Sequence, residues 1–238
     1  MHKINALIKY FLVTLGLAFT PLTYAQQPFQ FYDMIVSDPA GVVAALDKLH
    51  ESPTGQQSTS TVILSQYVAN GESLATHQIL VVYPSSQEMD VNLMRNATSP
   101  DWAEFLNDMQ GSASVEAEGL GQILAMSGNP NDPVATAMGR TNVIYQLSVG
   151  DPATYASAWS DFSGANLQEG TVSYLSSVLA YGANPTTHVV NNVYRSPGEA
   201  LLNQPQLMEG FDVFLQRVSG VRTVEGRMIT TVLAEWRP

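Results

Sequence analysis

Two stretches of the chain repeat one order of hydrophobic and polar segments. Each opens with an apolar run, at 31–36 and 142–149, whose β-branched and aromatic residues favour a strand. An Asp-Pro pair follows in both, at Asp38-Pro39 and Asp151-Pro152, where Asp suits a helix N-cap and Pro the first helical turn. Each predicted helix carries apolar residues near the helical period: Val42, Val43, Leu46 and Leu49 in the first, and Tyr155, Trp159 and Phe162 in the second.

A β-hairpin, a second helical region and a last strand complete each stretch. The hairpin runs are 60–68 and 76–83 in the first stretch and 171–180 and 187–194 in the second. Asn70-Gly71 is a strong hairpin signal between the first two runs. Helical patterns then cover 86–109, with a break near Ser99-Pro100, and 197–218, before strands at 114–126 and 221–236. The predicted order is β-α-β-β-α-β in each stretch, which is the ferredoxin-like unit.

Matching residues indicate that the second stretch is a copy of the first. Thr76-His77 and Thr187-His188 are each followed, four residues later, by Val-Tyr, and then by Ser and Glu at the same spacing. We therefore divide the chain into residues 1–25, a first repeat at 26–127, a linker at 128–139 and a second repeat at 140–238. The predicted fold class is α+β, with two tandem ferredoxin-like repeats.

Two such units in one chain resemble the dimeric α/β-barrel superfamily, in which two ferredoxin-like sheets pair face to face around a lumen. The resemblance covers nearly all of residues 27–237 and rests on element order and duplication. It implies a single-chain barrel, with two side-by-side domains as the alternative arrangement. Members include cofactor-independent monooxygenases, haem-degrading and peroxidase-like enzymes, small isomerases or lyases, and binding proteins. No stretch matches the active-site pattern of one branch, so the resemblance assigns no catalytic residue.

The first 25 residues have the pattern of a cleavable signal peptide. Lys3 and Lys9 precede an apolar run that is too short to span a bilayer, and Thr23-Tyr24-Ala25 places small residues before the expected cleavage site. The chain contains no cysteine, which excludes disulfides and a lipid anchor on an N-terminal cysteine. We expect a periplasmic or secreted protein that has no membrane attachment after cleavage.

The net charge argues against whole classes of partner. The full chain carries −11, and removal of the two signal lysines leaves −13. Phosphate backbones and anionic lipid surfaces would repel such a protein, so nucleic-acid and membrane-surface roles are disfavoured. The expected partner is a small apolar or anionic organic molecule. No feature of the sequence indicates an oligomeric state.

The candidate ligand-binding residues lie on the strand that begins with histidine in each repeat. Residues two apart share a face of a strand, so His188, Asn192 and Tyr194 align, as do His77 and Tyr83. The functional interpretation places these faces in the lumen, where they bind a ligand or move protons. The structural interpretation is that histidine and tyrosine complete hydrogen bonds at strand ends.

The second repeat is the more polar of the two. Asn191, Asn192 and Arg195 stand where the first repeat has Leu80, Val81 and Pro84. Arg195 suits a carboxylate or other anion, unless it lies at a rim that faces water. The histidine spacing favours no metal site, and no cofactor is expected. Three functions remain: a small-molecule-binding protein, an oxygenase- or isomerase-like enzyme that uses His188, Asn192 and Tyr194, and a self-associating or partner-binding module without a small ligand.

Overall fold

The computed structural model describes residues 26–238. The predicted signal peptide, residues 1–25, lies outside the described residues. Within the described part of the chain, no helix is long and apolar enough to cross a membrane.

The first half of the chain supplies four strands and three helices. They are β1 (Pro28–Val36), α1 (Pro39–Glu51), β2 (Thr61–Ala69), β3 (His77–Val82), α2 (Ser86–Ala97), α3 (Pro100–Gln110) and β4 (Ala113–Gly128). The predicted helix start is confirmed, because Asp38 Oδ1 accepts a hydrogen bond from the Gly41 amide at 3.1 Å. The predicted break is confirmed as well, because Ser99 caps a new helix that begins at Pro100.

The second half repeats this order with shorter final helices. Its elements are β5 (Thr141–Val149), α5 (Pro152–Asn166), β6 (Val172–Ala180), β7 (His188–Tyr194), α6 (Pro197–Leu202), α7 (Phe211–Arg217) and β8 (Arg222–Trp236). The predicted helix at 197–218 is wrong in its continuity, since α6 and α7 are separated by a short 3₁₀ turn at Pro205–Leu207. Pro205 lacks the amide hydrogen that a continuing helix would need. A short helix, α4 (Pro133–Thr136), lies in the connection between the halves.

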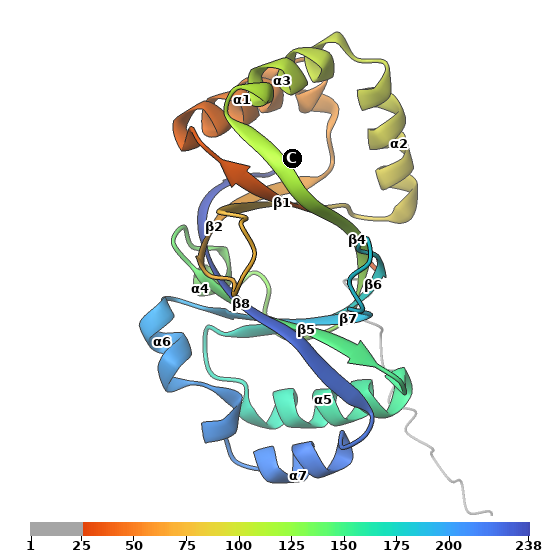
Figure 1. Cartoon of the computed structure of the whole chain (residues 1–238), viewed down its shortest axis with the longest axis vertical. Helices are drawn as coiled ribbons and strands as arrows, with labels where there is room; N and C mark the ends of the chain where they lie inside the picture. The colour runs from red at the N-terminus through yellow and green to blue at the C-terminus, as the bar shows by residue number, and fades with distance from the viewer. Residues whose placement is uncertain (1–25) are drawn as a thin grey trace, which may run out of the picture.

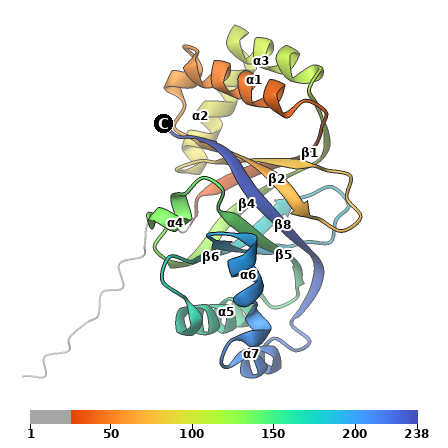
Figure 2. The same ribbon diagram turned by 90° about the vertical axis from the view of Figure 1, so that its left-hand side faces the viewer.

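The eight strands close into one barrel in the order β1-β3-β2-β8-β5-β7-β6-β4. Each half contributes a four-stranded sheet, and antiparallel pairing of β2 with β8 and of β4 with β6 joins the two sheets. Figure 1 shows the sheets face to face, with α1, α2 and α3 outside the first and α5, α6 and α7 outside the second. Figure 2 shows the strands crossing between the same two helical layers. Every strand therefore has an inner face toward the lumen and an outer face toward helices.

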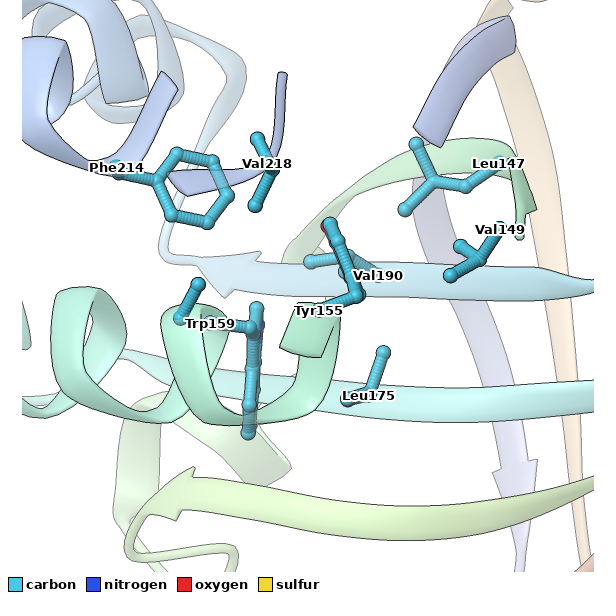
Figure 3. Close-up of a cluster of buried hydrophobic side chains, with 9 residues drawn as sticks. Leu147, Val149, Tyr155, Trp159, Leu175, Val190, Phe214 and Val218 are labelled. Atoms are coloured by element: carbon cyan, nitrogen blue, oxygen red, sulfur yellow. The ribbon is translucent and has the colours of Figure 1, made fainter. Parts of the chain in front are cut away.

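Apolar clusters fix the helices to the outer faces. Leu46 and Val42 of α1 pack with Leu64 and Ile79 of the first sheet. In the second half, Figure 3 shows side chains of α5 and α7 gathered with strand residues such as Val190. Burying one such side chain contributes about 1.5–3 kcal/mol, so these clusters hold the helices firmly on the sheets.

Candidate functional site

The lumen between the two sheets holds a cavity of about 330 Å³. Its walls are mainly apolar and come from both halves, including Phe29, Phe31, Leu80, Ile144, Val189 and Met228. Pockets of about 300–1,000 Å³ are the usual size for small organic ligands. The lumen is therefore large enough to be a candidate binding site.

Two glycines of β4 make room for the aromatic wall of the lumen. Gly119 lies against the ring of Phe31 and Gly121 against the ring of Phe29, so closely that a methyl group at either position would overlap the ring. The edge of Tyr181 meets Phe31 at a centroid distance of 4.9 Å. These contacts fix the aromatic side chains on one side of the cavity.

A buried carboxylate network closes one end of the barrel. Asp33 is 4% exposed, and its Oδ1 accepts hydrogen bonds from Tyr67 Oη at 2.6 Å and Gln78 Nε2 at 2.8 Å. Its Oδ2 accepts from Tyr181 Oη, 3.1 Å away, and Gln146 Nε2 donates to the same phenol at 3.3 Å. The network joins the halves, because Tyr181 and Gln146 belong to the second and the other members to the first.

The two phenols of this network remain protonated donors. Burial, and next the charge of Asp33, raises the pKa of Tyr67 far above its usual range. The same two causes raise the pKa of Tyr181 to about 12. Asp33 is thus surrounded by donors that do not ionise near neutral pH.

A buried ion pair lies near the other end of the lumen. Arg140 Nη2 and Glu235 Oε2 are 2.7 Å apart, and their side chains are 6% and 7% exposed. Arg140 Nη1 also donates to the Ala137 carbonyl at 3.0 Å, and Arg237 Nε lies 2.6 Å from the second oxygen of Glu235. Two arginines share the single carboxylate of Glu235 at this end, and the second of them, Arg237, is about half exposed to solvent.

One polar atom inside the lumen lacks a partner. Asn191 Nδ2 donates to Asn142 Oδ1 at 3.3 Å, but Asn191 Oδ1 is buried and has no hydrogen-bond partner among the described residues. The corresponding residue of the first half is Leu80, which also lines the lumen. A buried acceptor without a partner costs free energy, which a donor on a bound molecule would recover.

The expected placement of the His/Tyr strand faces in the lumen is wrong. His188 pairs across the sheet with Leu147, and its face of β7 also carries Val190, which packs against α5 and α7 in Figure 3. His77 lies likewise beside Met34, part of the core under α1. Both histidines face the helices, and neither lines a cavity found in the described residues.

Each histidine takes part in the same structural contact. His77 Nδ1 shares a hydrogen bond of 2.9 Å with Thr76 Oγ1, and His188 Nδ1 shares one of 3.0 Å with Thr187 Oγ1. Each threonine oxygen also accepts the amide hydrogen of a residue that ends the neighbouring strand. Burial lowers the pKa of both imidazoles. The repeated Thr-His pair therefore ties two strand ends together.

The other predicted residues are not gathered into one site. Asn192 and Tyr194 line a small cavity of about 120 Å³ between the second sheet and its helices. Tyr194 Oη donates to the Asn203 carbonyl, and Asn192 Oδ1 accepts from Ser173 Oγ at 2.6 Å. Tyr83 Oη donates to Gln30 Oε1 at 2.8 Å, and Tyr83 lies where the lumen meets the space under α2.

Arg195 lines neither the lumen nor the small cavity of the second half. Its backbone amide donates to Glu199 Oε2 at 2.6 Å, at the start of α6. Whether this residue or the other predicted residues bind a ligand stays a prediction.

The sequence reasoning overlooked Asp33 and its partners. A charged residue in the apolar strand β1, at the position that Gln146 occupies in β5, was a detectable signal. For metals, the described residues contain no cluster of three or more histidine or carboxylate side chains.

No profile of a known protein family matches the chain, and no curated protein sequence matches it. Solved structures do match. A candidate monooxygenase from Fusobacterium nucleatum has a TM-score of 0.58 at 15% identity, over 90% of this chain and 95% of that one. A candidate monooxygenase from Lactobacillus acidophilus has 0.55 at 10% identity, over 87% and 93%. A DypB variant from Rhodococcus jostii, in complex with haem, has 0.54 at 10% identity, over 90% and 96%. The chain therefore shares the dimeric α/β-barrel fold.

Because one of these structures contains haem, the question is whether a histidine of this chain lines a cavity that could hold haem. Haem iron takes an axial histidine in many proteins. His77 and His188 line neither the lumen nor the small cavity of the second half, and His50 lines a third cavity, between the first sheet and its helices. The lumen and the small cavity do not fit a histidine-ligated haem, and we derive no step through one.

Proposed function

We propose that this chain is an exported binding protein that holds a small, mainly apolar molecule in the lumen between two ferredoxin-like repeats. The unpartnered Asn191 Oδ1 inside a cavity of about 330 Å³ carries the proposal. Export rests on the pattern of residues 1–25. The two-repeat interpretation is supported by the β-α-β-β-α-β order of each half and by the equivalent Thr-His contacts.

The charges around the lumen favour an uncharged ligand. Asp33 accepts three hydrogen bonds from the protein, and Arg140 is paired with Glu235. A charged ligand in the apolar part of the lumen would lose its hydration, and the nearest excess charge, on Arg237, is about half exposed to solvent. A molecule with an apolar body and one hydroxyl or amide donor fits best, because a turn of the Asn191 side chain would bring its buried Oδ1 to that donor.

The same geometry favours binding over catalysis at the predicted residues. An oxygenase or isomerase using His188, Asn192 and Tyr194 needs these side chains around one substrate, but His188 lines no cavity in the described chain. The matched candidate monooxygenases keep an enzyme as the alternative function, on the basis of fold alone. A partner-binding module without a small ligand is disfavoured by the cavity, because that function needs no space in the lumen.

Native mass spectrometry of protein purified from its own host tests the proposal. We expect a polypeptide that begins at Gln26 and carries a non-covalent small-molecule adduct. Ser176 is 6% exposed and lines the lumen, so Ser176→Phe should fill part of the cavity and remove the adduct. Ser160→Phe, at an exposed position of α5, is the matched control and should retain it.

Circular dichroism must show that both variants are folded. An adduct that survives in folded Ser176→Phe would refute binding in the lumen. Wild-type protein without an adduct, and with no affinity for neutral apolar molecules from host extracts, would refute the binding function itself.

A further inference from the structure

A second cavity, of about 390 Å³, lies between the first sheet and α2. Its walls are apolar and aromatic, and include Leu46, Leu49, Ile79, Val81, Trp102 and Phe105. Figure 1 shows α1 and α3 over the sheet and α2 along one side of it. The cavity lies on the other face of the first sheet from the lumen, and Tyr83 lines both.

Polar contacts, not apolar packing, hold α2 in place. Three side chains on one face of the helix bond to the loop before β2: Glu88 to Thr59 at 2.8 Å, Asn92 to Ser58 at 3.0 Å and Arg95 to the Gln57 carbonyl at 2.7 Å. By contrast, Val91 and Met94 of the same helix are 49% and 73% exposed. The helix therefore spans the cavity without filling it.

The cavity has one cationic group without a carboxylate partner. Arg95 lines it, and its guanidinium bonds only to neutral oxygens, of Gln57 at 2.7 Å and Asn92 at 2.6 Å. Its Nε is buried and has no hydrogen-bond partner. Among the described residues no carboxylate forms an ion pair with Arg95, although the chain has 21 acidic residues. The Arg95 side chain is only partly buried, and its contact with the Gln57 carbonyl is exposed, so an anion at the mouth of the cavity can accept hydrogen bonds from the guanidinium.

We propose that this cavity is a second ligand site, which binds an amphipathic monocarboxylate of the medium-chain fatty-acid class. The alkyl chain lies among the apolar walls, and the carboxylate accepts hydrogen bonds from Arg95. The site is independent of the lumen and takes the opposite ligand chemistry, anionic instead of neutral.

The second half has no comparable space in the equivalent place. Its cavity measures about 120 Å³, because aromatic side chains of α5 and α7 occupy the region. Phe162 stacks on Phe214 at a centroid distance of 4.9 Å, and Phe211 packs beside both. Arg222 and Arg227 line this cavity, but its small volume leaves no room for an alkyl chain, so one carboxylate per chain is expected.

Tryptophan fluorescence gives a direct readout, since Trp102 and Trp236 both line the cavity. The mature chain, residues 26–238, is titrated with decanoate and, separately, with decanol, which has the same alkyl chain and no charge. Decanoate should change the emission with saturation at one equivalent and bind at least tenfold more tightly than decanol. Arg95→Gln should weaken decanoate binding about tenfold or more, because a charge-assisted contact is lost.

Two further variants distinguish binding in this cavity from binding elsewhere on the chain. Arg195→Gln removes an arginine that lines neither this cavity nor the lumen, and should leave decanoate affinity unchanged. Ser176→Phe fills the lumen and should also leave it unchanged, so failure of the lumen proposal does not affect this one. Equal affinity for decanol and decanoate, unchanged affinity in Arg95→Gln, or lost binding in folded Ser176→Phe would each overturn the proposal. If Arg95→Gln does not fold, the wild-type comparison of the two ligands decides.

Discussion

Replacing Asn191 by leucine should stabilise the protein while weakening its ligand. The change installs the residue that the first half has at the equivalent position, Leu80. It removes a buried acceptor without a partner, which costs about 1–3 kcal/mol. It also removes the donor 3.3 Å from Asn142 Oδ1, and because Asn142 is only partly buried this loss is worth about 0.5–1.5 kcal/mol. The balance is a gain of about 1 kcal/mol in the free energy of unfolding. For a chain of this size that raises the melting midpoint by about 2–4 °C.

Equilibrium unfolding in urea measures this difference on protein refolded from denaturant, so that neither variant carries a ligand. Asn192→Leu is the matched control on the outer face of the same strand. Its side-chain oxygen accepts from Ser173 at 2.6 Å, so its loss should destabilise the chain by about 1 kcal/mol. If Asn191→Leu is destabilised as much as the control, the protein itself satisfies the Asn191 oxygen and the expected gain in stability is wrong.

Three further predictions follow from the buried groups. Burial lowers the pKa of His77 and His188, so the unfolded chain binds more protons and the free energy of unfolding should fall as pH drops below about 6.5. The double change to glutamine should flatten this slope in urea titrations at several pH values, and equal slopes would contradict the assignment. Gly121→Ala places a methyl group against the ring of Phe29 and should lower stability by about 1–3 kcal/mol by calorimetry, whereas an unchanged midpoint would show that the ring lies elsewhere. Asp33→Ala leaves the hydroxyls of Tyr67 and Tyr181 without their acceptor and should cost about 3–5 kcal/mol in urea unfolding, whereas a loss below about 1 kcal/mol would mean that water reaches the network.

The order of strands and helices could be predicted because its signals are local. Asp38-Pro39 and Asp151-Pro152 start helices by capping, and Ser99-Pro100 separates two helices by the same means. The break within 197–218 was missed, although Pro205 marks it. Closure of the barrel is a pairing between distant strands, which no local pattern specifies.

The candidate site was predicted less well than the fold. Alternation along β7 showed correctly that His188 and Asn192 share a face, but not which face looks into the lumen. If one face of the sheet were exposed to water, its polar residues would show which face is buried. Here both faces of each sheet are buried, one by helices and one by the opposite sheet. The two faces therefore have similar hydrophobic patterns in the sequence. The lumen residue proved to be Asn191, which alternation places on the opposite face from Asn192.

The location of the bound molecule is the sharpest test of the proposed function. Crystals of the protein purified from its own host, with its adduct retained, should show density for one small molecule between the two sheets. A donor of that molecule should lie within hydrogen-bonding distance of Asn191 Oδ1. A lumen closed by side chains, with the adduct bound elsewhere on the chain, would contradict the proposed function.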